Sequence, residues 1–219
     1  MAAAVVADEL CRSGVDALDV DGAALIAISD HGDRVTLASS GPLSTRVAEL
    51  QMTTGEGPGL DAFTIRRPVL GPDMSTTAAA RRWPGFAASA VEIGVRAVFA
   101  IPLQAGVICC GTLQLHRQHP GPLTPRQLRD ALTLAEAGLW ALLEARAGVP
   151  PDQPSEPFGG GQDEVFQASG MISVQLSAGV DEALVRLRAH AYAHDRSIAD
   201  VAHDVIARRI RFERTPELG

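Results

Sequence analysis

The residues in this sequence that are best suited to binding chemistry are arginines close to the C-terminal end. Arg186 and Arg188 lie on one amphipathic segment, and Arg208, Arg209 and Arg211 follow the next one. A guanidinium group can hold a phosphate through two parallel hydrogen bonds and can stack on an unpaired base. The cluster is therefore a candidate nucleic-acid-binding surface. Arginines at the end of a helix are also favoured by the helix dipole without any ligand.

The charge of the chain limits how such a surface would work. The 219 residues contain 19 basic side chains, all arginine, and 26 acids, so the net charge is −7. Residues 163–219 hold seven arginines and nine acids, a local net charge of −2 (7 − 9). This balance argues against a general polyanion binder, so any RNA contact must come from a local group of arginines. The absence of lysine and the high alanine content are typical of a GC-rich genome, as in actinobacteria.

The elements that must position these arginines are three short helices in residues 163–214. Apolar residues recur at helical spacing in each helix, and Ser197 with Asp200 forms a capping pair before the third. The three stripes can bury one another, which predicts a small helical bundle with the arginines outside it. The stripes are Val165, Ala168 and Ile172, then Val180, Leu184, Leu187 and Ala191, then Ile198, Ala202, Ile206 and Ile210.

Three runs in this segment resemble a known family. They are Gln-Ala-Ser-Gly-Met at 167–171, Leu-Val-Arg-Leu-Arg-Ala-His-Ala at 184–191, and Ser-Ile-Ala-Asp-Val-Ala at 197–202. Together they resemble the ANTAR domain, the RNA-binding module of bacterial transcription antiterminators. The resemblance implies hairpin loops of nascent RNA as the partner, and it adds Gln167, Ala168 and Gly170 to the expected RNA-binding residues. Gly170 would allow a close approach of a nucleotide, whereas Ser169 stands where many relatives carry a basic residue.

A boundary separates this segment from the rest of the chain. Residues 148–162 contain Pro150, Pro151, Pro154 and Pro157, followed by three glycines at 159–161. Proline at this density prevents a helix, and the glycines make the joint loose. We therefore expect two domains, at residues 1–147 and 163–214, joined by a Pro/Gly-rich linker at 148–162.

The first domain is expected to be an α+β fold with an antiparallel sheet. Strand-like apolar runs occur at residues 23–28, 35–38, 68–70, 97–103 and 107–115, with turns at 30–33 and 104–106. Few helical stretches interrupt these strands, so helices on one face of the sheet fit best.

Two helices with heptad-like spacing lie at the ends of this domain. The second opens with a capping box at Thr124 and Gln127. Either helix can pack on the domain's own sheet or form a seam with a second copy, and the matching spacing of the two favours a homodimer. The spaced residues are Ala3, Ala7, Leu10, Gly14 and Ala17 in the first helix, and Leu128, Leu132, Ala135, Leu139 and Leu142 in the second.

Ordered motifs in residues 15–146 resemble a second family. They are Gly-Glu-Gly-Pro-Gly-Leu-Asp-Ala at 55–62, Arg-Pro-Val-Leu at 67–70, Trp-Pro-Gly-Phe at 83–86, and Gly-Val-Arg-Ala-Val-Phe-Ala-Ile-Pro-Leu at 94–103. Together they resemble a GAF domain, and more narrowly the GAF half of GAF–ANTAR regulators. The resemblance implies a sensor for a small molecule or a partner protein. Gly59 stands where many relatives carry cysteine, so thiol chemistry at that position is absent.

The GAF resemblance places a pocket between the sheet and its covering loops. The candidate pocket residues are Trp83, Phe86 and Phe99, with Asp73, Arg81 and Arg82 nearby in the sequence. Packing in the domain core is the alternative role for each of these aromatic side chains.

Catalysis has little support in the sequence. There is no phosphate-binding glycine loop ending in lysine and no nucleophile elbow. Cys11, Cys109 and Cys110 do not form a disulfide framework, and as neighbours on a strand Cys109 and Cys110 would face opposite sides. His116 and His119 have no further metal-ligand partners, so we expect no metal, no cofactor and no catalytic residues.

The sequence thus predicts a cytoplasmic, non-enzymatic antitermination regulator, since it has no apolar run long enough to cross a membrane. Two alternatives stay open. The first is a small-molecule or protein-docking GAF module whose helical tail only oligomerises. The second is a thiol-dependent GAF-type enzyme. A DNA-binding helix-turn-helix is disfavoured because the third C-terminal helix has a broad apolar face.

Overall fold

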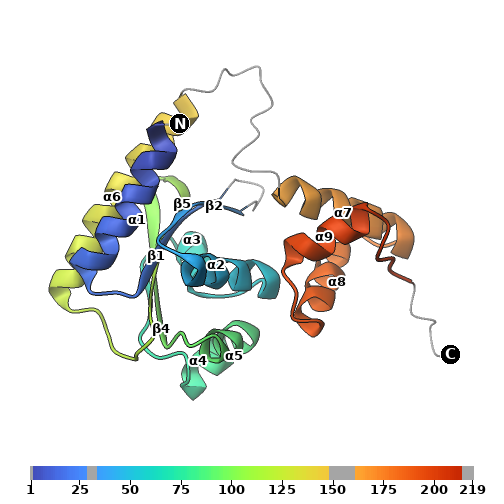
Figure 1. The fold of residues 1–219 in the computed structure, drawn as a ribbon, viewed down its shortest axis with the longest axis horizontal. Coiled ribbons are helices and arrows are strands. Elements are labelled where there is room, and N and C mark those ends of the chain that lie inside the picture. Colours follow the sequence, from blue (N-terminus) through green and yellow to red (C-terminus); the bar gives the residue numbers. More distant parts are fainter. Residues whose placement is uncertain (1, 29–33, 148–160, 214–219) are drawn as a thin grey trace. The chain divides into compact units, whose positions relative to one another are not determined.

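The computed structural model describes residues 2–28, 34–147 and 161–213. The chain divides into two compact units, one with the sheet and helices α1–α6 and the other with helices α7–α9 (Figure 1). Most of the predicted linker and the predicted turn at 30–33 lie outside the described residues.

A five-stranded antiparallel sheet forms the centre of the first unit, in the order β2-β1-β5-β4-β3. All five strands occur where the apolar runs predict them. In the central strands, Leu113 of β5 lies opposite Leu25 of β1 and Ile101 of β4. The strands are β1 (Gly22–Ile28), β2 (Arg34–Ser39), β3 (Val69–Gly71), β4 (Ala97–Ala105) and β5 (Ile108–Arg117).

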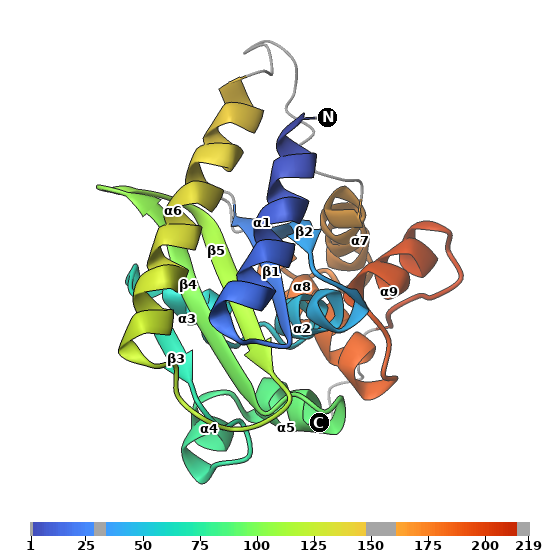
Figure 2. The ribbon, with the colours of Figure 1, turned by 60° about the vertical axis from the view of Figure 1, so that its left-hand side comes forward.

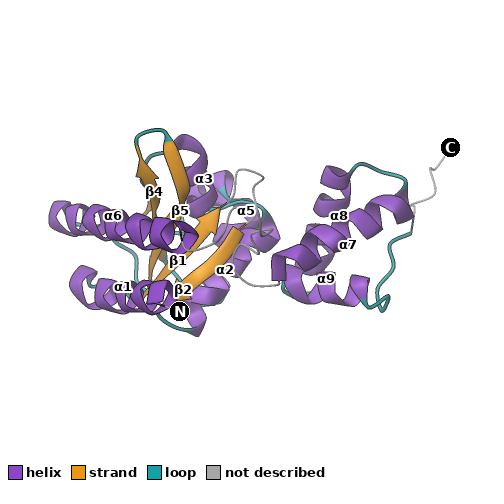
Figure 3. Cartoon of the chain, turned by 90° about the horizontal axis from the view of Figure 1, so that it is seen from above, coloured by secondary structure: helices purple, strands orange, loops and turns teal. Residues whose placement is uncertain are grey.

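Helices cover both faces of this sheet, so the prediction of helices on one face was wrong (Figures 2 and 3). One face carries α1 (Ala2–Leu18) and α6 (Pro125–Ala147). The other carries four shorter helices, which are rich in small and turn-forming residues and therefore give weak helical periodicity. They are α2 (Pro42–Thr54), α3 (Pro58–Ile65), α4 (Thr77–Arg82) and α5 (Pro84–Glu92). Because both faces are covered, β1 is buried at every position.

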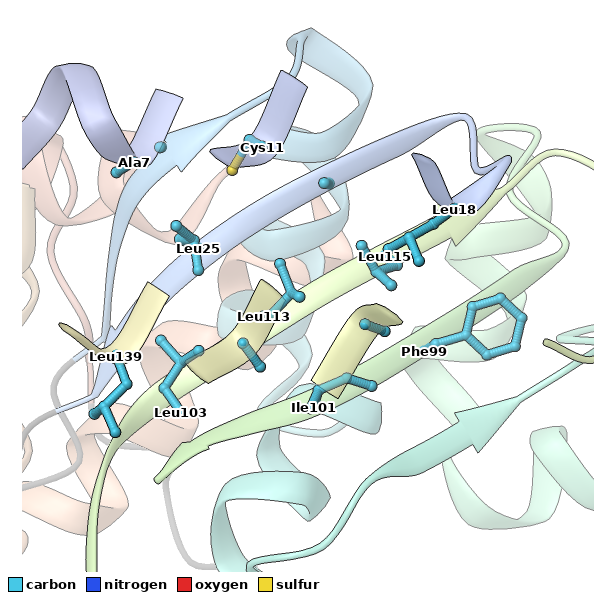
Figure 4. Packing of buried hydrophobic residues seen from close by; sticks show 14 of the residues in the cluster. Ala7, Cys11, Leu18, Leu25, Phe99, Ile101, Leu103, Leu113, Leu115 and Leu139 are labelled. Carbon is cyan, nitrogen blue, oxygen red and sulfur yellow. The ribbon is translucent and has the colours of Figure 1, made fainter. Parts of the chain in front are cut away.

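The heptad-spaced residues mostly pack on the domain's own sheet (Figure 4). Leu139 and Leu142 join the same buried cluster as Leu25, Leu113 and Cys11. A side chain at Gly14 would collide with Leu134, so glycine there lets α1 approach α6. Leu132, which is 44% exposed, and Ala17 are exceptions. The side chain of Ala3 lies outside the described residues.

The second unit is a three-helix bundle with its own core. Its helices are α7 (Gly161–Leu176), α8 (Val180–Ala193) and α9 (Ile198–Ile206), and the predicted stripes form one buried cluster. Val180 is the exception, since it is 48% exposed, and Ile210 packs on the cluster from beyond the end of α9. The predicted cap is confirmed, because Ser197 Oγ accepts a hydrogen bond from the N–H of Asp200 at 3.1 Å. After α9 the chain turns back toward α7, where the N–H of Phe212 donates to Gln175 Oε1 at 2.8 Å.

Candidate functional site

The arginines of the second unit differ in how firmly they are paired. Asp204 on α9 binds Arg196 at 2.7 Å and Arg209 at 3.0 Å. These hydrogen bonds lower the pKa of Asp204. Arg209 is therefore partly neutralised in the bundle.

Arg208 and Arg211 are exposed, and neither has an ion pair within the part of the chain that the structure describes. Arg208 has φ = 59°, a left-handed conformation that ends α9 and directs the following segment back across the bundle. In that segment Ile210 and Phe212 pack against the bundle core. Arg211 lies between them in the sequence and is exposed, so the segment presents its charge outward.

The arginines on α8 lie at different depths. Arg186 is exposed and reaches Glu182, one turn earlier, at 3.7 Å. Both side chains are about half exposed, so this pair holds Arg186 only weakly. Arg188 follows the fully buried Leu187 and is itself half-buried.

The three expected contacts on α7 do not share one environment. Gln167 is exposed, and Gly170 has open space where a side chain would be. Ala168 is fully buried in the bundle core, so the expectation that it contacts RNA is corrected. Ala168 belongs to the apolar stripe of α7, and it can act on an outer surface only through helix packing. Ser169 is buried too, and its hydroxyl donates to the carbonyl oxygen of Val165.

A group of three rings, absent from the expected site, lies on the same unit. The rings of His190 and His194 stack with centroids 4.1 Å apart, and Phe212 meets His190 edge-on at 5.3 Å. The spacing of the two histidines by four residues on a helix could have indicated their proximity. Nothing in the sequence indicates that Phe212 folds back onto them.

The expected sensor-pocket residues lie on opposite faces of the sheet. Trp83 and Phe86 are buried together on the α4–α5 side, in one cluster with Val98. Phe99 is buried on the α1–α6 side (Figure 4). Neighbouring residues of a strand alternate between faces, so Phe99 cannot join the other two aromatic side chains. The grouping of the three in one pocket is therefore corrected.

Hydrogen bonds link the motif at residues 55–62 to the motif at residues 83–86 and to the neighbouring Arg82. Trp83 Nε1 donates to Asp61 Oδ2 at 3.1 Å, and Arg82 reaches the same oxygen at 2.7 Å. Glu56 Oε1 accepts from the N–H groups of Gly85 and Phe86. The acids of the first motif therefore hold α4 and α5 in place.

Two buried glutamines, Gln51 and Gln114, lie beside Gly59, the position at which the GAF resemblance led us to compare this chain with relatives that carry cysteine. Gln51 Oε1 accepts from the N–H of Gly59 at 2.7 Å, while Gln51 Nε2 donates to Gln114 Oε1 at 2.7 Å. A side chain at Gly59 would overlap the Gln114 amide. The two buried glutamines therefore occupy the space that a larger residue at this position would need.

A second buried polar pair lies on the same sheet. His116 is 2% exposed, and its Nε2 atom lies 3.0 Å from Ser44 Oγ. Burial lowers the pKa of His116 to about 4, against a small opposite effect of Asp21. The imidazole is therefore neutral at pH 7. His119, three residues further along, is exposed and faces Asp21 at 3.7 Å.

The three cysteines are all buried, including both Cys109 and Cys110. Both members of the pair are buried because helices cover both faces of the sheet. Burial raises the pKa of Cys11 to about 11 and also raises that of Cys109. Such thiols are poor nucleophiles at neutral pH. Among the described residues, no three histidine, cysteine or acidic side chains are placed to hold a metal ion.

The helices of the described residues are too short or too polar to cross a bilayer.

The order of strands, the helix pair α1 and α6, and the motif contacts together match one family. The GAF domain family model covers residues 3–142. This chain belongs to the GAF family. A GAF domain is a sensor module that binds a small molecule or a partner protein, so the first unit has a place in signal transduction. No curated protein matches the sequence.

Solved GAF structures support the fold. The GAF domain of a phosphoenolpyruvate-protein phosphotransferase from Coxiella burnetii aligns with a TM-score of 0.54 at 21% identity, over 66% of this chain and 84% of that one. The GAF domain of the Acinetobacter phosphotransferase gives 0.52 at 15%, over 66% and 84%. A domain of a protein named as a two-component sensor histidine kinase, from Sinorhizobium meliloti, gives 0.52 at 19%, over 65% and 92%. At these identities the likeness concerns the fold alone.

Proposed function

We propose that this chain is a cytoplasmic, non-enzymatic regulator of transcription antitermination. In this proposal the GAF domain receives a signal, and α7–α9 form an ANTAR-like domain that binds hairpin loops of nascent RNA. Binding would hold the transcript in a form that prevents a terminator hairpin. The observation that carries the proposal is the exposed pair Arg208 and Arg211, without ion pairs among the described residues, beside a bundle whose core is built from the ANTAR-like sequence pattern.

The environment of the thiols supports a regulator over a thiol-dependent enzyme. Cys11, Cys109 and Cys110 are all buried, and burial disfavours the reactive thiolate of Cys11 and Cys109. A nucleophilic cysteine needs access to its substrate and a lowered pKa. All three thiols are buried, and the pKa values of Cys11 and Cys109 are raised, not lowered.

A homodimer is part of the proposal, through exposed residues of α1 and α6 and not through the heptad residues that are buried against the sheet. Trp140 is 56% exposed and Leu132 is 44% exposed on α6, and Val6 is exposed on α1. The helices α1 and α6 lie side by side, and each carries at least one exposed large apolar residue. Exposed large apolar residues on paired helices are a common basis for association.

The experiment that tests the RNA proposal replaces Arg208 and Arg211 together by alanine in the full-length protein. The probe is a pool of RNA hairpins with a constant stem and a randomised loop, and the control replaces Arg126 and Arg129 on α6, which changes the net charge equally. Each lost charged contact should weaken binding by about 1–3 kcal/mol. It should also reduce the slope of log K against log[salt] by the amount that corresponds to about one phosphate contact. Equal affinity of wild type and the Arg208/Arg211 variant would exclude this pair as an RNA contact.

A further inference from the structure

The rings of His190, His194 and Phe212 form an ordered platform on the outside of the bundle. The imidazole planes are inclined by 24° and their centroids are 4.1 Å apart. His194 Nδ1 lies 2.8 Å from the carbonyl oxygen of His190, which fixes its orientation. Phe212 is held by its backbone hydrogen bond to Gln175 and supports His190 from the side. The platform therefore exists before any ligand arrives, so little side-chain entropy is lost on binding.

The outer end of this platform reaches solvent. His194 is exposed, whereas His190 and Phe212 are half-buried beneath it. Burial, followed by the nearby His194 and Arg196, lowers the pKa of His190. The inner ring is consequently neutral at pH 7, and the stack is free of repulsion between two imidazolium charges.

Two exposed arginines lie close to the platform residues in the sequence. Arg186 precedes His190 by one helical turn, and Arg211 precedes Phe212 in the returning segment. The nearby acids are Glu182, which reaches Arg186 at 3.7 Å, Asp195, which follows His194, and Glu213, which follows Phe212. An exposed pair at this distance is easily exchanged for a phosphate. Aromatic rings combined with nearby cationic groups are the arrangement that binds single-stranded nucleic acid.

We propose that the stacked rings of His190 and His194 bind an unpaired RNA base, while Arg186 and Arg211 hold the neighbouring phosphates. This rests on the proposed RNA-binding function and names a contact within it. Both faces of a base inside a duplex are covered by its neighbours, so only a loop or single-stranded nucleotide can stack on the outer face of His194. Phe212 is a positioning residue, because it supports His190 and does not touch the base.

The test measures affinity of the full-length protein for the hairpin pool with a randomised loop, and for the stem alone as a duplex. His194→Ala removes the outer ring, and His194→Phe keeps a ring without its nitrogen atoms. The control is His203→Ala, an exposed histidine on α9 that lies away from the platform and 3.5 Å from Glu164. Stacking on one base predicts a loss of about tenfold for His194→Ala, with near wild-type affinity for His194→Phe and His203→Ala.

The arginine contacts give a second readout. Arg186→Ala and Arg211→Ala should each reduce the salt dependence of binding by about one phosphate, whereas His194→Ala should leave that dependence unchanged. Binding of the duplex stem should not respond to His194→Ala.

Three outcomes would overturn the inference. If wild type binds the hairpins and His194→Ala binds them equally, the platform is not an RNA contact, although the proposed function stands. If wild type binds neither hairpins nor duplex, the proposed function fails and this contact fails with it. If His194→Ala instead abolishes association between protein molecules and leaves RNA affinity unchanged, the platform is a protein interface.

Discussion

Glu56 Oε1 accepts hydrogen bonds from the backbone N–H of Phe86 at 2.9 Å and from that of the preceding Gly85 at 2.6 Å. These N–H groups belong to the first turn of α5, where no earlier carbonyl is available to them. A carboxylate 30 residues away in the sequence therefore caps the helix. This one contact explains why a Gly-Glu-Gly-Pro motif and a Trp-Pro-Gly-Phe motif occur in the same chain.

Removing this cap should destabilise the sensor domain. We expect Glu56→Ala to lower the free energy of unfolding by about 1–2 kcal/mol, because two N–H groups at the start of α5 lose their acceptor. Glu56→Gln keeps an oxygen acceptor and should cost less. Urea denaturation measures both, and Glu92→Ala, at the exposed other end of α5, is the control. Equal loss for Glu56→Ala and Glu92→Ala would contradict the capping role.

His116 should make stability depend on pH. Its pKa is lowered from 6.5 to about 4 in the folded protein, so between these values the unfolded chain binds a proton that the folded chain does not. The domain is then fully stable above about pH 6.5 and loses stability as the pH falls toward 4. At about 1.4 kcal/mol per pKa unit, the loss is at most about 3 kcal/mol.

The measurement for His116 compares unfolding free energies between pH 7 and pH 4.5 in wild type and His116→Gln. Acidic residues add their own dependence, so the difference between the two proteins isolates the histidine. The exposed His119, replaced by glutamine, serves as the control. Parallel pH profiles for wild type and His116→Gln would show that the buried imidazole does not carry this effect.

Arg117 should be among the most sensitive polar residues of the sensor domain. Its buried guanidinium donates to the carbonyl oxygens of Leu18 and Asp19, at the end of α1, and to that of Pro122 before α6. Arg117→Leu removes the side-chain donor to the carbonyls of Asp19 and Pro122, whereas the carbonyl of Leu18 keeps its hydrogen bond from Gln127 Nε2, and the change should cost about 2–4 kcal/mol. Thermal and urea unfolding measure the loss. Gln118 is exposed and adjacent, so the free energy of unfolding of Gln118→Ala should stay within about 0.5 kcal/mol of wild type. An equally small change for Arg117→Leu would show that the Arg117 hydrogen bonds do not stabilise the domain.

Substitutions on α6 can distinguish an effect on the proposed dimer from an effect on the domain core. Leu132→Asp and Trp140→Glu introduce charge on the exposed side of α6 and should give folded monomers in sedimentation velocity. Leu139→Asp is expected to unfold the domain, because Leu139 is 1% exposed in the core. Glu136→Gln on the same helix is the matched surface control. A monomeric wild type, or dimers of unchanged affinity in both surface variants, would rule out this interface.

Local patterns in the sequence were enough to predict most elements of the fold. Alternating and continuous apolar runs located all five strands, and helical stripes located α1, α6 and the three helices α7–α9. Ser197 was recognised as a cap because capping depends on residues only three positions apart. The GAF motifs predicted the family of the first domain. Their order along the sequence can be seen without knowing any tertiary contact.

Tertiary structure decided what those elements do with their side chains. Phe99 lies on the opposite face of the sheet from Trp83. Which side chains share a pocket therefore depends on which helices cover each face. Packing buried Ala168, paired Arg209 with Asp204, and brought Phe212 back to His190 from 22 positions further along the chain. Burial, ion pairing and ring stacking act between residues that are distant in sequence, so periodicity and composition carry no signal for them.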